Sequence, residues 1–153
     1  MTDTFSRMSD EQSVLEANAA FYGAFEALDA DAMAAVWSNT SADVCIHPGW
    51  DLLIGERQVQ ESWSMIFANT SYLRFEASDV RVSVAEDMAT VSCIENIFSV
   101  IEGHTVHSRM ACTNVFRRSV QPGGSWEMVV HHASPIAAGQ TVVRMSDDDG
   151  GMN

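Results

Sequence analysis

The sequence predicts an α+β domain in which three N-terminal helices pack on a strongly curved antiparallel sheet. The first half of the chain carries apolar residues at helical spacing, and the segments after residue 72 alternate between apolar and polar side chains. Two turn signals, Glu102-Gly103 and the segment 121–124, divide this second part into long consecutive strands. Consecutive long strands form an antiparallel meander, and helices that precede the meander in sequence pack on one face of its sheet. A sheet that curves around them forms a cone with a pocket at its open end.

Three segments are predicted to be helical. Ser9 can cap the first helix, which then presents one apolar stripe. Asp29 or Asp31 begins a short second helix over residues 32–37, and a third helix covers 56–68. The stripe of the first helix consists of Val14, Leu15, Asn18, Phe21, Tyr22, Phe25 and Leu28.

The predicted strands begin with a short one over residues 43–47, which must end at Pro48-Gly49. A brief extended piece lies between it and the third helix. Four long strands follow the third helix, over 73–84, 88–101, 104–118 and 126–136. Glu102-Gly103 is a two-residue hairpin turn, so the second and third of these long strands should pair directly.

Length and charge bound the organisation and the partners. The chain has 153 residues, which predicts a single domain over residues 9–144, with a flexible N-terminus over 1–8 and an acidic disordered tail over 145–153. Lys+Arg is 8, Asp+Glu is 21, and the net charge is -13, which excludes nucleic acid and anionic membranes as partners. All the basic residues are arginines, so Schiff-base chemistry and a phosphate-binding P-loop are excluded.

The cellular location is predicted from what the chain lacks. No apolar run approaches the ~20 residues that cross a bilayer, and residues 1–10 have no signal-peptide core. Cys45, Cys93 and Cys112 are odd in number and show no CxxC spacing, so we expect three small buried hydrophobes rather than disulfides. The expected location is a reducing cytoplasm.

Several short segments, in their order along the chain, resemble the nuclear-transport-factor-2-like superfamily in its bacterial SnoaL-like or ketosteroid-isomerase-like branch. The resemblance covers nearly the whole chain and implies the NTF2-like (cystatin-like) cone. It also implies a homodimer and a small-molecule pocket that works without a metal or cofactor. The segments that carry it are Phe21-Tyr22-Gly23-Ala24-Phe25, Val36-Trp37, His47-Pro48-Gly49-Trp50, Ser62-Trp63, Cys93-Ile94-Glu95-Asn96, Thr113-Asn114-Val115-Phe116 and 126–135.

The sequence also departs from that branch at two positions. Ketosteroid isomerases place a tyrosine on the first helix, where Phe21 stands here with Tyr22 beside it. Their catalytic base is an aspartate next to a proline at the end of the first strand, and this chain has His47 before Pro48 there. A steroid isomerase that uses this aspartate is therefore not expected.

Glu95 and His47 are the two candidates for a catalytic base. Glu95 follows Val91 and Cys93 in alternation, so a carboxylate points where apolar residues point. In a pocket, desolvation would raise its pKa and make it a usable base, whereas an outward-facing strand end would leave it an ordinary surface residue. His47 ends a strand near the mouth of the cone and could move a proton there, or could simply bond a loop carbonyl.

Asn114 and one histidine complete the expected site. Asn114 lies in an apolar row, where it could hold a substrate oxygen or bond Glu95 on the neighbouring strand. His131 and His132 are adjacent on a strand and face opposite ways. Strict alternation places His132 on the same face as Trp126, Met128 and Val130. His132 is therefore assigned to the pocket and expected to be catalytic. Cross-strand packing or a dimer surface would also account for a histidine at either position.

A metal at this site is not expected. His47, Glu95 and His132 are ligand types that suit iron or zinc, but no local spacing supports a metal, and the resemblance implies none. The expected substrate-binding wall is aromatic, although aromatic residues at helical spacing are also typical of plain core. It consists of Phe21, Tyr22, Trp37, Trp50 and Trp63, with Asn114.

Two functions remain open at the level of sequence. The favoured one is a cofactor-independent proton-transfer enzyme (an isomerase, dehydratase or cyclase) that acts on a small hydrophobic carbonyl compound. The alternative is a non-catalytic ligand-binding or dimerisation module with the same pocket. An enzyme needs two titratable groups within hydrogen-bond reach of one point, whereas a binder needs only shape. We expect a homodimer through the outer face of the sheet, because Val100-Ile101 and Val129-Val130 make the strands apolar on both sides.

Overall fold

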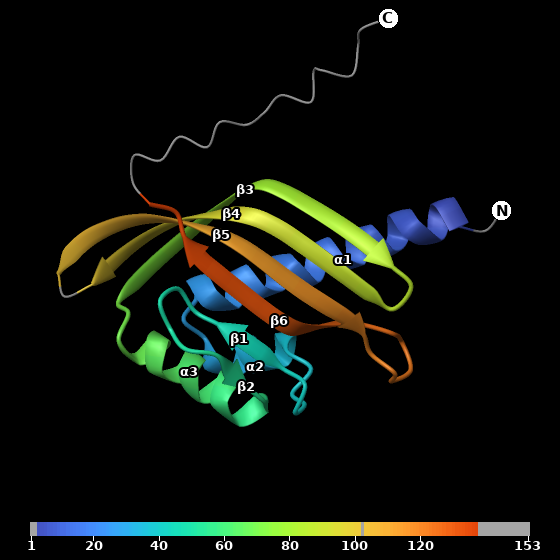
Figure 1. Ribbon diagram of the computed structural model, residues 1–153, viewed down its shortest axis with the longest axis horizontal. Helices are drawn as coiled ribbons and strands as arrows, with labels where there is room; N and C mark the ends of the chain where they lie inside the picture. The colour runs from blue at the N-terminus through green and yellow to red at the C-terminus, as the bar shows by residue number, and fades with distance from the viewer. Residues whose placement is uncertain (1–2, 102, 138–153) are drawn as a thin grey trace, which may run out of the picture.

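The computed structural model describes residues 3–101 and 103–137, and the expected acidic tail lies outside these residues. The chain folds as an α+β domain in which the helices gather on one side of a curved sheet, as predicted (Figure 1). The helices are α1 (Asp3–Glu26), α2 (Ala30–Val36) and α3 (Glu56–Ala68). The strands are β1 (Val44–Ile46), β2 (Leu53–Ile54), β3 (Tyr72–Ala85), β4 (Met88–Ile101), β5 (His104–Arg118) and β6 (Trp126–Pro135).

The six-stranded sheet has the order β2-β1-β6-β5-β4-β3. The four long strands form the predicted antiparallel meander, and β2 pairs antiparallel with β1. The sheet as a whole is mixed, because β1 lies parallel to β6. This pairing brings Cys45 in β1 next to His131 in β6, and His47 comes directly after the end of β1 at Ile46.

The first two helices meet at a tight break that the sequence located correctly. Leu28 adopts a left-handed conformation with φ 54, and the amide of Asp29 donates to the carbonyl of Ala24 at 3.1 Å. The Asp29 side chain then caps α2 by accepting from the amide of Ala32 at 3.0 Å. At its other end, α1 begins at Asp3 rather than at the predicted Ser9, so Ser9 is an interior helical residue.

The aromatic core holds α1 against α3. Phe21 and Phe25 both pack edge to face on Trp63, with ring centroids 5.6 and 4.7 Å apart, respectively. Phe21 and Trp63 are completely buried. Phe25 also packs on Phe75 of β3 at 4.4 Å, which fixes the helical layer to the far edge of the sheet. The site is built on this core.

The β4–β5 hairpin has the register that a two-residue turn dictates. Ile101 pairs with His104, and from there the pairing runs without a shift to Met88 and Arg117. Cys93 therefore lies directly opposite Cys112, and Glu95, two residues further along β4, lies opposite Met110. The sequence alone fixes these cross-strand neighbours once the turn is recognised.

A register shift in β6 changes which histidine faces the core. Val115 pairs with Val130, but the next residue of β5, Phe116, pairs with Met128, so Val129 is an extra residue in β6. Alternation reverses at such a bulge. The assignment of His132 to the pocket was therefore wrong: His131 is buried at 1% exposure, and His132 is exposed on the outer face. The bulge also explains why Val129-Val130 suggested a strand that is apolar on both sides.

Candidate active site

A cavity of about 260 Å³ lies between the end of α3, the loop after β1 and the concave face of β4, β5 and β6. Its wall includes a carboxyl group, two imidazoles and an indole, together with two hydroxyl groups. These belong to Glu95, His47, His131, Trp50, Ser99 and Ser108. The polar groups come from four different strands and loops, so only the folded chain brings them together.

Glu95 projects from β4 into this cavity and is 2% exposed. The Tyr22 hydroxyl of α1 donates a hydrogen bond of 2.6 Å to its Oε2. Burial raises the pKa of Glu95 above its ordinary value, and the hydrogen bonds from Tyr22 and Cys112 oppose part of that rise. Glu95 is thus a buried carboxyl group with one oxygen held by Tyr22 of α1.

Asn114 organises the polar groups beneath the cavity. Its Nδ2 donates to Asn18 Oδ1 at 2.9 Å and to the Tyr22 hydroxyl at 3.2 Å. Because that nitrogen is the donor, Oδ1 is the acceptor, and His131 Nδ1 donates to it at 2.7 Å. One chain of hydrogen bonds therefore runs from His131 through Asn114 and Tyr22 to Glu95.

His131 is the histidine that the sequence placed on the wrong face. Its Nδ1 carries the proton given to Asn114, so its Nε2 keeps a lone pair. Burial lowers the pKa of His131 to about 3, helped by His47 and His132, so the ring is neutral at pH 7. Phe21 packs on the ring at a centroid distance of 4.8 Å and holds its orientation.

His47 faces His131 across the site, with ring centroids 6.3 Å apart. Ser62 of α3 donates its only hydroxyl proton to the carbonyl of Val59 at 2.6 Å. Its oxygen can then only accept from His47 Nε2, which lies 2.9 Å away, so Nδ1 of His47 is left unprotonated. Burial lowers the pKa of His47 to about 4, and this ring is also neutral at pH 7.

The electrostatic result is a site rich in proton acceptors. Both imidazoles are neutral with a nitrogen lone pair left, and Glu95 has one oxygen that Tyr22 does not hold. Asn114 cannot stabilise a substrate oxyanion, because both of its amide protons are used within the protein. The lining groups able to donate include the hydroxyls of Ser99 and Ser108 and the indole N–H of Trp50, whereas the Thr70 hydroxyl donates to the carbonyl of Ile66.

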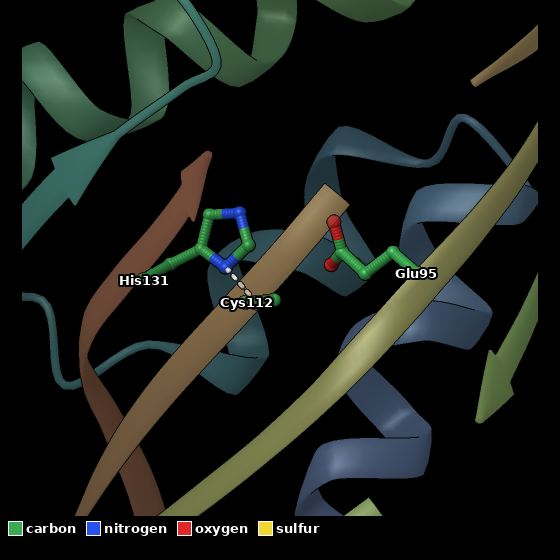
Figure 2. Close-up of side chains that lie close together, drawn as sticks. All are labelled: Glu95, Cys112 and His131. Atoms are coloured by element: carbon green, nitrogen blue, oxygen red, sulfur yellow. Dashed lines mark hydrogen bonds between the residues drawn. The ribbon is translucent and has the colours of Figure 1, made fainter. Parts of the chain in front are cut away.

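Among the residues that the structure describes, one group could hold a metal. Glu95, Cys112 and His131 come from three adjacent strands, and one ligand atom of each lies within 4.8 Å of the others (Figure 2). His131 Nδ1 is 3.7 Å from Cys112 Sγ, a separation compatible with shared coordination. Tyr22 holds Oε2 of Glu95 and Asn114 holds Nδ1 of His131, so a metal bound through these two atoms would displace both hydrogen bonds.

The predicted aromatic wall is mostly core rather than pocket. Trp50 lines the cavity and packs edge to face on His47 at 4.9 Å. Phe21, Trp37 and Trp63 are buried in the hydrophobic core behind it and are not part of the cavity wall. Of the expected substrate-binding residues, Tyr22 and Asn114 act from beneath the cavity, where they hold Glu95 and His131.

Sequence reasoning missed Asn18, Ser62, Ser99 and Ser108. Asn18 had a usable signal, since it is the one amide in the apolar stripe of α1 and stands one turn before Tyr22. A second cavity of about 380 Å³ lies on the other side of this pair, between α1 and β3. Its wall includes Asn18, Tyr22, Glu26 and Glu95, so the Glu95 side chain borders both cavities.

Comparison with known proteins agrees with this architecture. Residues 14–138 match the SnoaL-like domain family. A Streptomyces avermitilis structure described as a candidate dehydratase of the NTF2-like family is 40% identical, with a TM-score of 0.79, and the match covers 86% of this chain and 99% of that chain. A candidate calcium/calmodulin-dependent protein kinase type II association domain from Thiobacillus denitrificans is 34% identical, with a TM-score of 0.67, over 79% and 93% of the two chains.

One curated relative is much longer than this chain. The F-box protein SKIP8 of Arabidopsis thaliana is 28% identical over 123 residues, which are 80% of this chain but 49% of that protein. A ketosteroid isomerase-like protein from Erwinia carotovora atroseptica has a TM-score of 0.71 at 21% identity, over 84% of this chain and 97% of that chain, and supports the fold. The protein belongs to the SnoaL-like family of the NTF2-like superfamily.

Within the residues that the structure describes, helices of the length and hydrophobicity needed to cross a membrane were not found.

Proposed function

We propose that this protein is a cofactor-independent enzyme that removes a proton next to the carbonyl group of a small hydrophobic molecule. The observation that carries the proposal is Glu95: a buried carboxyl group in the wall of a cavity, held by Tyr22 and facing His131. A ligand atom of Glu95 and one of His131 lie within 4.8 Å of each other, so one substrate atom could contact both. This is the polar convergence that separates an enzyme from a simple binder.

In the proposed reaction, the Glu95 oxygen that Tyr22 leaves available takes the α-proton. Burial favours this step because it raises the proton affinity of the carboxylate. The substrate oxygen, which gains negative charge, would accept hydrogen bonds from Ser99 and Ser108. His131 or His47, both neutral acceptors, would take part in moving the proton onward.

One relative supports a reaction of the dehydratase type. A 40% identical structure is described as a candidate dehydratase, and dehydration of a β-hydroxy carbonyl compound begins with the same α-proton removal as isomerisation. The cavity of about 260 Å³ is smaller than typical drug-sized sites of ~300–1,000 Å³, which favours a compact one- or two-ring substrate.

The test is deuterium exchange at the α-carbon of a panel of compact cyclic ketones and β-hydroxy ketones, followed by NMR in D₂O. We expect the wild-type protein to accelerate exchange for some members and Glu95→Gln to reduce the rate by about 10²–10⁴-fold. Glu26→Gln is the matched control, because Glu26 lines only the second cavity and should leave the rate unchanged. Exchange that survives in Glu95→Gln would reassign the base to His47, tested by His47→Gln.

The second candidate is a binding or dimerisation module without catalysis. It is favoured by the 34% identical structure, whose description names an association domain. It predicts ligand binding in the cavity with no exchange for any ketone in the panel, and equal affinity in Glu95→Gln.

We also propose a homodimer through the outer face of the sheet. A shallow hollow of about 430 Å³ lies there, and its wall includes Ile94, Thr113 and the exposed His132. Light scattering at micromolar concentration should give twice the monomer mass, and Thr113→Arg should halve it. A wild-type monomer under these conditions would refute the proposal.

A further inference from the structure

Cys93 and Cys112 are a pair of neighbouring thiols that have no role in the proposed proton transfer. They are directly opposite residues of the antiparallel strands β4 and β5, and both side chains face the buried side of the sheet. Directly opposite residues in such a pair have Cα atoms about 4.5–5.5 Å apart. A disulfide accepts Cα separations of roughly 4.4–6.8 Å, so the backbone already has the required spacing.

The two sulfur atoms converge on one point. The Tyr22 hydroxyl oxygen lies 3.4 Å from Cys93 Sγ and 3.5 Å from Cys112 Sγ. Both thiols are therefore on the same side of their strands and lean toward the same atom of α1. The hairpin register allows no slippage between them, because the pairing is continuous from Ile101 and His104 down to Met88 and Arg117.

The two thiols also differ in character. A hydrogen bond from the Cys112 thiol lowers the pKa of Cys93, whereas the pKa of Cys112 is raised by that same contact and by burial. Thiolate character makes a thiol a nucleophile toward peroxide. Cys93 is therefore the attacking residue and Cys112 the resolving one.

We infer that Cys93 and Cys112 form a reversible disulfide when the protein meets a peroxide, and that this bond is a redox modification site beneath Tyr22. In the first step the Cys93 thiolate attacks one peroxide oxygen, the O–O bond breaks, and the leaving hydroxide takes a proton to become water. In the second step the Cys112 sulfur attacks the sulfenic acid of Cys93, the S–S bond forms, and the Cys112 proton leaves with hydroxide as a second water. One peroxide is reduced and two thiols are oxidised.

Access and consequence both involve Tyr22. Its side chain lines the cavity of about 380 Å³ beside α1, which is large enough for hydrogen peroxide. Neither cysteine is part of that wall, so a peroxide in this cavity reaches the thiols past the Tyr22 hydroxyl, which contacts both sulfur atoms. In the reduced protein both sulfur atoms contact the Tyr22 hydroxyl, which in turn donates a hydrogen bond to Glu95. A disulfide would draw the two sulfur atoms together and change these contacts. Oxidation would therefore disturb the Glu95 carboxylate, and this consequence alone rests on the proposed function.

Cys45 is an internal control. It is completely buried in β1, where it pairs with Leu53 and His131 rather than with a cysteine. Its sulfur contacts His47 Nε2 at 3.5 Å, and burial raises its pKa, so its thiol should resist peroxide.

The experiment treats the folded protein with hydrogen peroxide, denatures it, alkylates the remaining thiols and digests it with trypsin. Cleavage after Arg81, Arg109 and Arg117 puts Cys93 in peptide 82–109 and Cys112 in peptide 110–117. We expect these two peptides to be joined, two of the three thiols to be lost, and dithiothreitol to restore both. Cys45→Ser should behave in the same way as wild type.

Two results would overturn the inference. One is that Cys93 and Cys112 stay fully alkylatable or are oxidised to sulfinic acid without a link. The other is that the link joins two chains rather than two peptides of one chain, which a non-reducing gel shows. Because the mapping uses wild-type protein, it does not depend on whether Cys93→Ala folds. The disulfide inference also holds if the protein exchanges the α-proton of no ketone. If the disulfide forms but the rate of α-proton exchange stays the same, only the proposed effect on Glu95 is refuted.

Discussion

Two buried, neutral histidines should make this protein sensitive to mild acid. His47 is 3% exposed and His131 is 1% exposed. Burial lowers the pKa of His47 to about 4 and that of His131 to about 3, from 6.5. The unfolded chain therefore binds protons at both rings below pH 6.5, while the folded protein does not. Stability from these rings is fully present above pH 6.5 and is lost progressively as the pH falls toward 4 and then 3.

The magnitude follows from the size of these shifts. Each pKa unit corresponds to about 1.4 kcal/mol, and between pH 7 and pH 5 each unfolded ring binds on average roughly 0.7 of a proton that the folded ring does not. Each histidine should therefore lower the free energy of unfolding by about 2 kcal/mol over this range, and the two together by about 4 kcal/mol. For a domain of this length, a loss of that size lowers the melting temperature by roughly 10 °C.

Glu95 acts in the opposite direction and must be separated from the histidines. Burial raises its pKa, so its contribution is greatest at low pH and is lost as the pH rises through its folded value. The groups that face His131 are His47, Glu95, Cys112 and Asn114, and Asn114 has no titration of its own. Measurements in a Glu95→Gln background therefore isolate the two imidazoles.

The assay is urea unfolding at pH 7, 6 and 5 at one protein concentration. His131→Gln and His47→Gln should each remove about half of the decrease, on the order of 2 kcal/mol. His132→Gln is the matched control, because His132 is adjacent in sequence but exposed on the outer face. All of these variants are measured in the Glu95→Gln background. The reasoning is refuted if the stability of Glu95→Gln is equal at pH 7 and pH 5, or if both histidine variants keep the full decrease.

Three further substitutions test the packing and the hydrogen bonds of the site. Glu95→Gln should gain stability relative to wild type as the pH rises from 4 to 8, because it removes a carboxylate whose charge burial disfavours; thermal unfolding across this range measures it. Phe21→Ala should cost about 3–5 kcal/mol in urea unfolding, since Phe21 is completely buried between Trp63 and His131. Asn114→Ala should cost about 1–3 kcal/mol for each buried partner left without a bond. It should also release the His131 tautomer, which ¹⁵N NMR of the ring nitrogens detects.

Most of the fold was accessible from local signals. The two-residue turn at Glu102-Gly103 determines the register of β4 and β5, and the helix break at Asp29 follows from capping chemistry. The parallel pairing of β1 with β6 was not accessible in this way. It joins residues far apart in the sequence, and a strand of the length of Val44–Ile46 carries too little alternation to choose a neighbour.

The site was predicted in part, and the error has one cause. Glu95 occupies the inward position that alternation gave it, because β4 pairs with β5 without a shift. His132 was placed on the wrong face because alternation was continued through Val129, where the strand has an extra residue. A bulge of this kind in apolar sequence leaves no turn residue to mark it. Only the partner strand, where Phe116 pairs with Met128, reveals it.

The bulge and Asn114 together determine what the site can do. Without the bulge, His131 would face outward and Asn114 Oδ1 would lose the hydrogen bond from His131. With the bulge, Asn114 donates to the Tyr22 oxygen and accepts from His131 Nδ1, so that Tyr22 donates its own proton to Glu95 and His131 Nε2 keeps a lone pair. Asn114 and Tyr22 hold His131 and Glu95 as acceptors, and Ser62 holds His47 as an acceptor, an arrangement that fits the proposed removal of a proton.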